Sequence, residues 1–247
     1  MRHILPLEPR ENARRLLERC KRLIHDCTRK PAFLVDGDRT LTSGDTSRTF
    51  LERAGGDPAA IKASFERHGY CFESFRFHAE MHLALGRDAF RHFAPLVARQ
   101  TLLYPGAVDF LCHASARGRV IVVTAGIPAI WREILALHRL DEIEVIGGID
   151  HETPLVLGVE EKGIVARQIA RVASRVVGVG DSEIDAEMLH ACDHAVVVLN
   201  NRRSCELLRQ VRSHKSLSHI APHGVPLDDV PLTDWIDLVP LALRASA

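Results

Sequence analysis

FLVDGDRTLT, residues 33–42, is the stretch on which the interpretation of the whole sequence depends. Residues 32–35 form a short apolar run, which is typical of a buried strand. Asp36 and Asp38 follow, with only Gly37 between them. Two carboxylates this close repel each other, so a chain that needed only to fold would gain little from the pair. The pair therefore indicates a chemical role at the end of a strand.

Strand-like and helix-like segments alternate along the chain after residue 104. Apolar β-branched runs predict strands, and amphipathic segments between them predict helices. This alternation is typical of an α/β fold, here a Rossmann-like, doubly wound, mostly parallel sheet with helices on both faces. Strands are expected at 32–36, 119–124, 143–147, 175–180 and 195–199, and helices at 106–117, 127–138, 160–172, 183–191 and 203–211.

Four regions are expected along the chain. Residues 1–30 form an N-terminal helical extension, because apolar residues recur at helical spacing in 10–27. Residues 31–42 and 105–211 form the α/β core, and the proline-containing tail, 212–247, has no assigned role. Residues 43–104 hold seven of the nine phenylalanines and are expected to form an inserted helical cap with helices at 46–54, 58–68, 72–84 and 87–98. The spacing of the phenylalanines in this cap favours core positions over a binding surface.

Composition excludes several classes of function. Lys+Arg and Asp+Glu number 32 each, so the chain does not have the charge of a strongly basic nucleic-acid binder. Apolar runs are far shorter than the roughly 18 residues of a membrane helix, and the N-terminus lacks the apolar core of a signal peptide. We therefore expect no nucleic-acid or membrane partner and a cytoplasmic location. The six cysteines form no C-x-x-C pair and the fourteen histidines show no zinc spacing, so neither a disulfide framework nor a zinc site is expected.

Polar residues fall at the carboxyl ends of the predicted strands, where open parallel sheets bind ligands. Asp36 and Asp38 follow the first strand, and Thr124 ends the second. Asp181 follows the strand at 175–180, and Asp185 lies one helical turn later, where it can share a ligand with Asp181.

Carboxylates that converge on one cleft need a cation, and a site of oxygen ligands with room for water suits Mg²⁺. Lys162 supports this interpretation, because a positive charge in the first turn of a helix is unfavourable unless a negative group is near. An EF-hand calcium loop requires Gly at its sixth position and Glu at its twelfth, and Leu41 and Ser47 stand there.

Mg²⁺ together with a lysine and a hydroxyl can hold a phosphoryl group. One aspartate can then attack phosphorus and form an aspartyl phosphate. The other must start protonated, donate to the leaving alkoxide and then accept a proton from the hydrolytic water. We therefore expect Asp36 to attack and Asp38 to transfer protons.

The motifs "DGDRT", "VVTAG", "EKG" and "GDSEID" stand in the order typical of the haloacid dehalogenase superfamily, and the chain most resembles its phosphoserine-phosphatase-like branch. The resemblance covers roughly residues 32–205 and implies an aspartyl-phosphate phosphatase with a cap. It implies that Asp36 is the nucleophile and a magnesium ligand, and that Asp38 is the acid/base and a ligand through its backbone carbonyl. Asp181 would bind magnesium directly and Asp185 would support it through water. Thr124 would bind the phosphoryl group and Lys162 would neutralise it.

The substrate is less defined than the chemistry. Thr124, Ala125 and Gly126 stand where phosphoserine phosphatases usually show S-G-G, so the added bulk makes phosphoserine a doubtful substrate. Asp45 lies near the position of the acid that binds the substrate's ammonium in that branch, and an N-cap role is the alternative. Arg76 could hold a carboxylate, and a solvated helix face is the alternative.

The sequence thus predicts a magnesium-dependent phosphatase acting on a small phosphorylated metabolite. A phosphotransferase with the same site is one alternative, and a non-catalytic regulatory or partner-binding module on the same fold is another. The oligomeric state stays open.

Overall fold

A six-stranded, all-parallel sheet forms the centre of the protein. The computed structural model describes residues 8–222 and 230–243. The strands follow the order β3-β2-β1-β4-β5-β6, and β1 pairs with both β2 and β4. The apolar runs predicted as strands are buried on both faces, as a parallel sheet between helices requires. The strands are β1 (Pro31–Val35), β2 (Arg119–Thr124), β3 (Glu144–Gly147), β4 (Arg175–Gly180), β5 (His194–Val198) and β6 (Leu217–Ile220).

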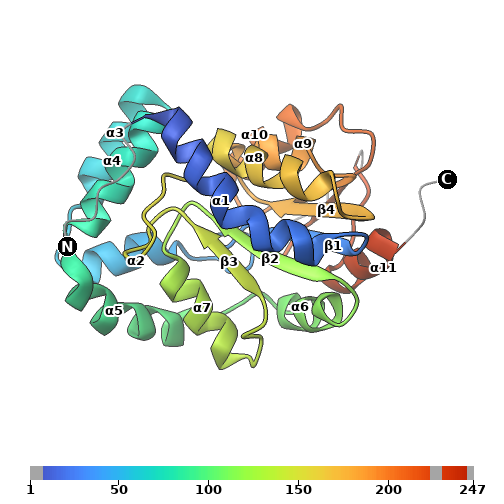
Figure 1. Cartoon of the computed structure of the whole chain (residues 1–247), viewed down its shortest axis with the longest axis horizontal. Coiled ribbons are helices and arrows are strands. Elements are labelled where there is room, and N and C mark those ends of the chain that lie inside the picture. Colours follow the sequence, from blue (N-terminus) through green and yellow to red (C-terminus); the bar gives the residue numbers. More distant parts are fainter. Residues whose placement is uncertain (1–7, 223–229, 244–247) are drawn as a thin grey trace.

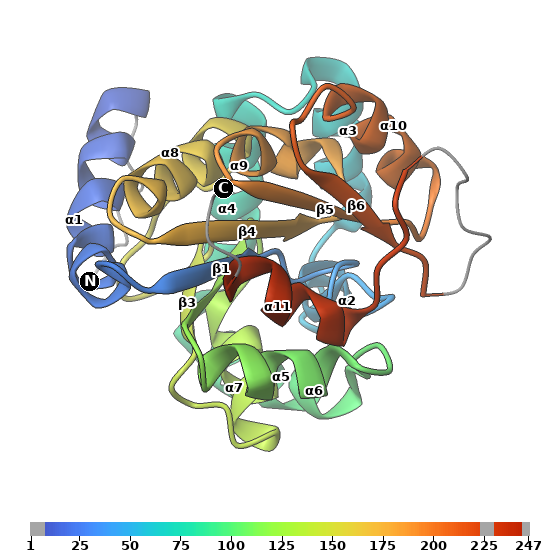
Figure 2. The same ribbon diagram turned by 90° about the vertical axis from the view of Figure 1, so that its right-hand side faces the viewer.

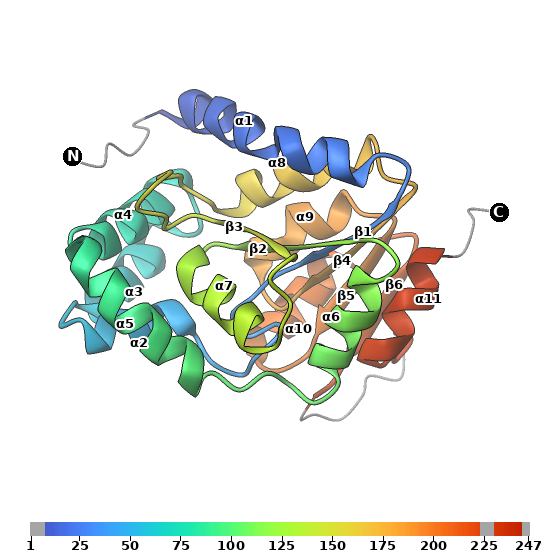
Figure 3. The same cartoon turned by 60° about the horizontal axis from the view of Figure 1, so that its bottom comes forward.

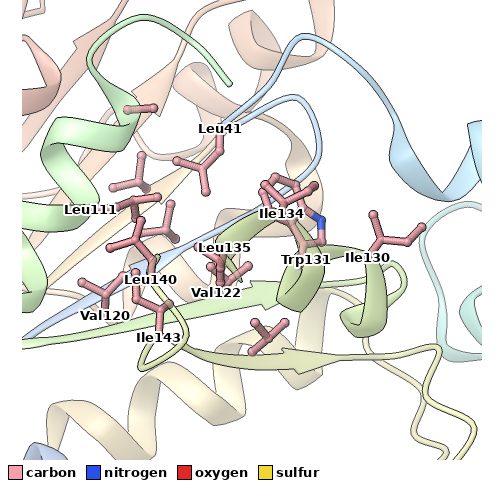
Figure 4. Packing of buried hydrophobic residues seen from close by; sticks show 14 of the residues in the cluster. Leu41, Leu111, Val120, Val122, Ile130, Trp131, Ile134, Leu135, Leu140 and Ile143 are labelled. Carbon is pink, nitrogen blue, oxygen red and sulfur yellow. The ribbon is translucent and has the colours of Figure 1, made fainter. Parts of the chain in front are cut away.

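Helices cover both faces of this sheet (Figures 1 and 2). One face carries α1 (Pro9–Cys27), α8 (Val159–Ala170), α9 (Ala186–His190) and α10 (Arg202–Gln210). The other carries α6 (Ala107–Ser115), α7 (Pro128–Leu137) and α11 (Leu238–Leu243). Figure 4 shows the side chains of α7 packed with those of β2, among them the fully buried Trp131. The α/β fold class predicted from the sequence is therefore confirmed.

The predicted N-terminal helix, α1, packs on α8 and belongs to the helical layer of the sheet. Its buried Asn12 side chain donates to the carbonyl of Val156 at 2.7 Å and accepts from the amide of the same residue at 2.9 Å. This pairing fixes α1 to the loop before α8. Residues 1–7 of the predicted extension lie outside the described residues.

Four of the five helices between β1 and β2 in the chain gather at one end of the sheet (Figure 3). They are α2 (Thr46–Arg53), α3 (Pro58–His68), α4 (Phe72–Leu83) and α5 (Gly86–Gln100), which we call the insertion. The two chain segments that join it to the core pair with each other, since Thr42 Oγ1 donates to the Leu102 carbonyl at 2.7 Å and the Tyr104 amide donates to Leu41 at 2.8 Å. The division of the chain at residues 43 and 104 stays a prediction.

The tail contains a strand that the sequence did not predict, and a short helical element where the pattern TDWIDLV becomes periodic. The segment LSHI forms β6 on the edge of the sheet, beside β5. Further on, the short 3₁₀ helix Trp235–Asp237 leads into α11, and Trp235 lies 5.7 Å from the ring of Phe110 in α6. Residues 223–229 and 244–247 of the tail lie outside the described residues. Within the described ranges, no helix combines the length and apolar character that a membrane crossing requires.

Candidate active site

The carboxyl ends of three adjacent strands bring the predicted polar residues together. Asp36 follows β1, Thr124 ends β2 and Asp181 follows β4, and all three side chains are buried. Lys162 reaches this edge from the first turns of α8, and only 1% of its surface is exposed. Its Nζ lies 2.6 Å from Asp36 Oδ1 and 2.7 Å from Asp185 Oδ1, so one buried ammonium joins two carboxylates from different parts of the chain.

Asp36, Asp181 and Asp185 form a compact acidic cluster. One carboxylate oxygen of each lies within 4.8 Å of those of the other two. Thr40 Oγ1 stands between two of the carboxylates, 2.9 Å from Asp36 Oδ2 and 3.3 Å from Asp181 Oδ1. Asp185 Oδ2 accepts from the backbone amides of Asp181 and Ser182 at 3.0 and 3.2 Å. These bonds fix the orientation of the cluster before any ligand arrives.

The negative charge of the three carboxylates in this cluster exceeds the positive charge of the side chains around them. Burial raises the pKa of Asp36 to about 6 although Lys162 opposes the shift, and burial followed by the charge of Asp36 raises the pKa of Asp181 well above its usual value. Burial by itself would lower the pKa of Lys162, but the charges of Asp185 and Asp36 keep that pKa above its ordinary value. Asp181 Oδ2 is buried without a hydrogen-bond partner among the described residues, and Arg39 Nε is 3.6 Å away. An orphaned carboxylate oxygen in an acidic, oxygen-only cluster fits a hard divalent cation.

Asp38 faces a different part of the site from the acidic cluster. Its Oδ1 accepts from Thr46 Oγ1 at 2.7 Å. Burial, and next the charge of Asp45, raises the pKa of Asp38 to about 7. A carboxyl group with this pKa can carry a proton near neutral pH, as a general acid must. Its predicted role as a metal ligand through the backbone carbonyl stays a prediction.

Core and insertion meet closely at Gly126. The Gly126 amide donates to Thr124 Oγ1 at 3.0 Å. A Cβ at position 126 would lie 2.3 Å from Ser47 Oγ in α2 and 3.3 Å from Asp38 Oδ2. Ser47 is 3% exposed, and its hydroxyl has no hydrogen-bond partner among the described residues. A side chain at 126 would require Ser47 Oγ to move, and glycine leaves space bounded by the hydroxyls of Thr124 and Ser47 and the carboxyl group of Asp38.

Gly37 is required for a second close approach. A Cβ at this position would lie 2.4 Å from the indole ring of Trp131. Trp131 is fully buried in α7 and packs directly beneath the loop that carries Asp36 and Asp38. The glycine between the two aspartates therefore lets the loop rest on a rigid aromatic side chain.

The two residues predicted to bind the leaving group differ in position. Asp45 lines the cavity above the site, caps α2 by accepting from the Arg48 amide at 2.9 Å, and accepts from Arg39 Nη1 at 2.9 Å. Arg76 is on α4 with its Nε 3.7 Å from Glu80, and it is not among the residues that line the cavity. Their predicted contacts with substrate stay predictions.

Several contributing residues were not singled out from the sequence. Thr40 belongs to the quoted motif, whose order could have revealed it. Thr46 and Ser47 gave no signal, because their contacts with Asp38 and Gly126 depend on how α2 lies over the sheet edge. Trp131 also carried no local signal, since its importance comes from its contact with Gly37.

A cavity of about 640 Å³ opens above these groups. Asp36, Asp181, Lys162 and the triplet Thr124–Gly126 line its inner end. Side chains of α2, α3 and α4 line most of the rest, together with Ile184 and Arg203 of the core.

Comparisons with known proteins agree with this arrangement. The sequence model of the haloacid dehalogenase-like hydrolases matches residues 33–190, which is more than half of the chain. Among curated proteins, no sequence matches the chain significantly.

Solved structures share the fold at low sequence identity. A substrate-bound phosphoserine phosphatase is 18% identical with a TM-score of 0.54, over 74% of this chain and 97% of that one. A protein of unknown function from Bordetella pertussis Tohama I is 20% identical with a TM-score of 0.58, over 77% and 98% of the two chains. A probable phosphoserine phosphatase from Vibrio cholerae is 15% identical with a TM-score of 0.57, over 89% and 69%. At these identities the likeness shows the fold alone.

Proposed function

We propose that this chain, which belongs to the haloacid dehalogenase-like hydrolase family, is a magnesium-dependent phosphatase that hydrolyses a small phosphomonoester through an aspartyl-phosphate intermediate. The observation that carries the proposal is the buried contact of Lys162 with both Asp36 and Asp185, beside Asp181 at the strand ends. A phosphoryl transfer site needs this combination of a carboxylate nucleophile, a fixed cation and further acidic ligands.

Each residue of the site would have its own role in the two steps of the reaction. An oxygen of Asp36 attacks phosphorus, the bond from phosphorus to the ester oxygen breaks, and protonated Asp38 donates its proton to that leaving oxygen. Asp38 then accepts a proton from water, whose oxygen attacks phosphorus and breaks the bond to Asp36. Thr124, Ala125 and Gly126 would bind the phosphoryl oxygens, and Lys162 would balance their charge.

The acidic cluster suits the metal that such a reaction uses. Asp36, Asp181 and Asp185 would hold Mg²⁺, with Asp38 contributing its backbone carbonyl. A bound Mg²⁺ would stabilise the charge that develops on the phosphoryl oxygens. Asp181 Oδ2, buried and without a hydrogen-bond partner among the described residues, supports this assignment.

The insertion would act as a cap over the reacting groups. It places Thr46 against Asp38 and Ser47 against Gly126, and its helices line most of the cavity. A cap of this kind excludes water and selects the leaving group. The cytoplasmic location belongs to this proposal, whereas the predicted substrate contacts of Asp45 and Arg76 stay predictions outside it.

A panel of phosphomonoesters, including phosphoserine, sugar phosphates and nucleoside monophosphates, tests the proposal. Phosphate release is expected with Mg²⁺ and not with a chelator, and Asp36→Asn should lower kcat/KM by at least about a thousandfold. Added alcohol that captures the phosphoryl group in place of water would indicate a phosphotransferase. Failure to release or transfer phosphate from any ester would contradict the proposal.

A further inference from the structure

The cavity extends well beyond the reacting groups. Its volume is about 640 Å³, within the range of about 300–1,000 Å³ of sites that enclose whole small molecules. The proposed chemistry uses only the inner end, where the phosphoryl group would lie. The outer part, formed by the insertion, must then surround the leaving group.

Three aromatic rings from the insertion form one wall of this outer part. Phe65 of α3, Tyr70 of the following loop and Phe75 of α4 all line the cavity. The ring of Phe65 lies 5.5 Å from that of Tyr70 and 5.1 Å from that of Phe75, and Tyr70 and Phe75 are 6.2 Å apart. Phe65 and Tyr70 are only half-buried. We call these three residues the aromatic wall.

Apolar side chains continue the surface beside the aromatic wall. Leu51 of α2 and Ile61 of α3 line the cavity next to it. Leu51 is buried, whereas Ile61 is half-buried. The outer part of the cavity therefore presents apolar side chains against which a flat group can pack.

Several of the charges around this surface are paired within the protein, while Arg203, which also lines the cavity, lies with its guanidinium 6.0 Å from the centroid of the Tyr70 ring. Asp45 accepts from Arg39 and from the Arg48 amide, each at 2.9 Å. Arg48 Nε donates to Glu52 at 2.8 Å, and Lys62 lies 3.5 Å from Glu66. The ammonium of an amino-acid leaving group would have to compete with Arg39 for Asp45, whereas an apolar leaving group would not.

We infer that the substrate is a phosphomonoester whose leaving alcohol carries an aromatic ring, and that this ring packs on the aromatic wall. The inference rests on the proposed phosphatase function and names the substrate class of the same site. An aromatic group fills the outer cavity and excludes water from it, whereas a serine-sized group leaves the aromatic wall exposed to water. The difference in buried apolar area is expected to raise kcat/KM by at least about tenfold.

Esters with equal leaving-group chemistry give the sharpest test. Kinetics with Mg²⁺ would compare 2-phenylethyl phosphate, ethyl phosphate and phosphoserine. The first two are both primary alkyl esters, so they differ chiefly in the distant ring. We expect kcat/KM for 2-phenylethyl phosphate to exceed that for each of the others at least about tenfold, mainly through KM.

Variants of the aromatic wall test whether it causes the preference for the ester with an aromatic ring. Phe65→Ala should reduce the ratio of kcat/KM between 2-phenylethyl and ethyl phosphate by about tenfold. Phe77→Ala is the matched control, because Phe77 is also half-buried in the insertion but lines a separate cavity, and it should leave the ratio unchanged. Tyr70→Ala provides a second variant if Phe65→Ala does not fold.

The outcomes separate the two claims. Hydrolysis of phosphoserine as efficient as that of 2-phenylethyl phosphate would overturn the inference without contradicting the phosphatase function. A ratio of kcat/KM between 2-phenylethyl and ethyl phosphate that is unchanged in both Phe65→Ala and Tyr70→Ala would do the same. If no ester releases phosphate, the phosphatase proposal itself fails.

Discussion

Lys162 is a fully buried cation whose charge is balanced by Asp36 and Asp185. Lys162→Met would leave two buried carboxylates without their counter-charge, so we expect the free energy of unfolding to fall by about 3–5 kcal/mol in the absence of metal. Urea unfolding measures this loss.

The matched control for Lys162 is Lys62→Met, which removes an exposed lysine paired with Glu66 at 3.5 Å. A surface pair of this kind contributes less than about 1 kcal/mol. Equal losses in the two variants would show that the buried contact of Lys162 is not formed in solution.

Gly37 offers a test of the loop geometry. Gly37→Ala places a methyl group 2.4 Å from the indole of Trp131. We expect a loss of about 1–3 kcal/mol in stability from overpacking, together with a loss of phosphatase activity as Asp36 and Asp38 shift. Gly44→Ala is the control, because the nearest atom to its added methyl group is 4.0 Å away. If both variants behave alike in unfolding and activity assays, Trp131 does not support the loop.

Single residues show what the sequence can and cannot indicate. Asp36, Thr124 and Asp181 were expected at one sheet edge because parallel strands end together, and the structure places them there. Phe65 and Phe75 were expected in the core from their helical spacing. Both also line the cavity, since periodicity identifies an inward face without telling whether that face meets protein or a ligand.

The two segments that join the insertion to the core determine how freely it moves. Thr42→Val removes the bond from Oγ1 to the Leu102 carbonyl and should cost about 1 kcal/mol. It should also speed hydrogen exchange at the neighbouring Tyr104 amide, which donates to Leu41. Thr101→Val removes a comparable bond within α5, to Val97, and should leave that amide protected. Equal exchange in both variants would argue against pairing of the two segments.

β5 and β6 are joined by a histidine that folding keeps neutral. The ring of His194 contacts Ser216 Oγ at 2.6 Å and Ser218 Oγ at 2.9 Å. Burial, followed by the charges of Arg175 and His214, lowers the pKa of His194 from 6.5 to about 4. The unfolded chain therefore binds the proton more readily, so this contribution to stability is complete above about pH 6.5 and is lost as the pH falls toward 4.

His194→Gln should make stability less sensitive to acid. Between pH 7.5 and 5, the wild type should lose about 1 kcal/mol more than the variant, after allowance for screening by solvent. Urea midpoints at the two pH values measure the difference. Identical slopes would show that His194 does not titrate between the folded and unfolded states as described.

Helices and strands were predictable where the sequence pattern was strong. The five predicted strands are present, and no end differs from its predicted position by more than one residue. β6 was missed because LSHI has only two apolar residues, and its pairing with β5 decides its structure. α5 contains Pro95, as the predicted helix did, and extends two residues beyond the predicted end at residue 98, to Gln100.

In the assembled chain, the proposed reaction passes through one covalent event at Asp36. Acid quenching during turnover of ethyl phosphate with Mg²⁺, followed by peptide mapping by mass spectrometry, would detect it directly. We expect a phosphoryl group on the peptide that carries Asp36, and none with a chelator or in Asp36→Asn. Turnover without this adduct, or with the phosphoryl group on another residue, would contradict the account.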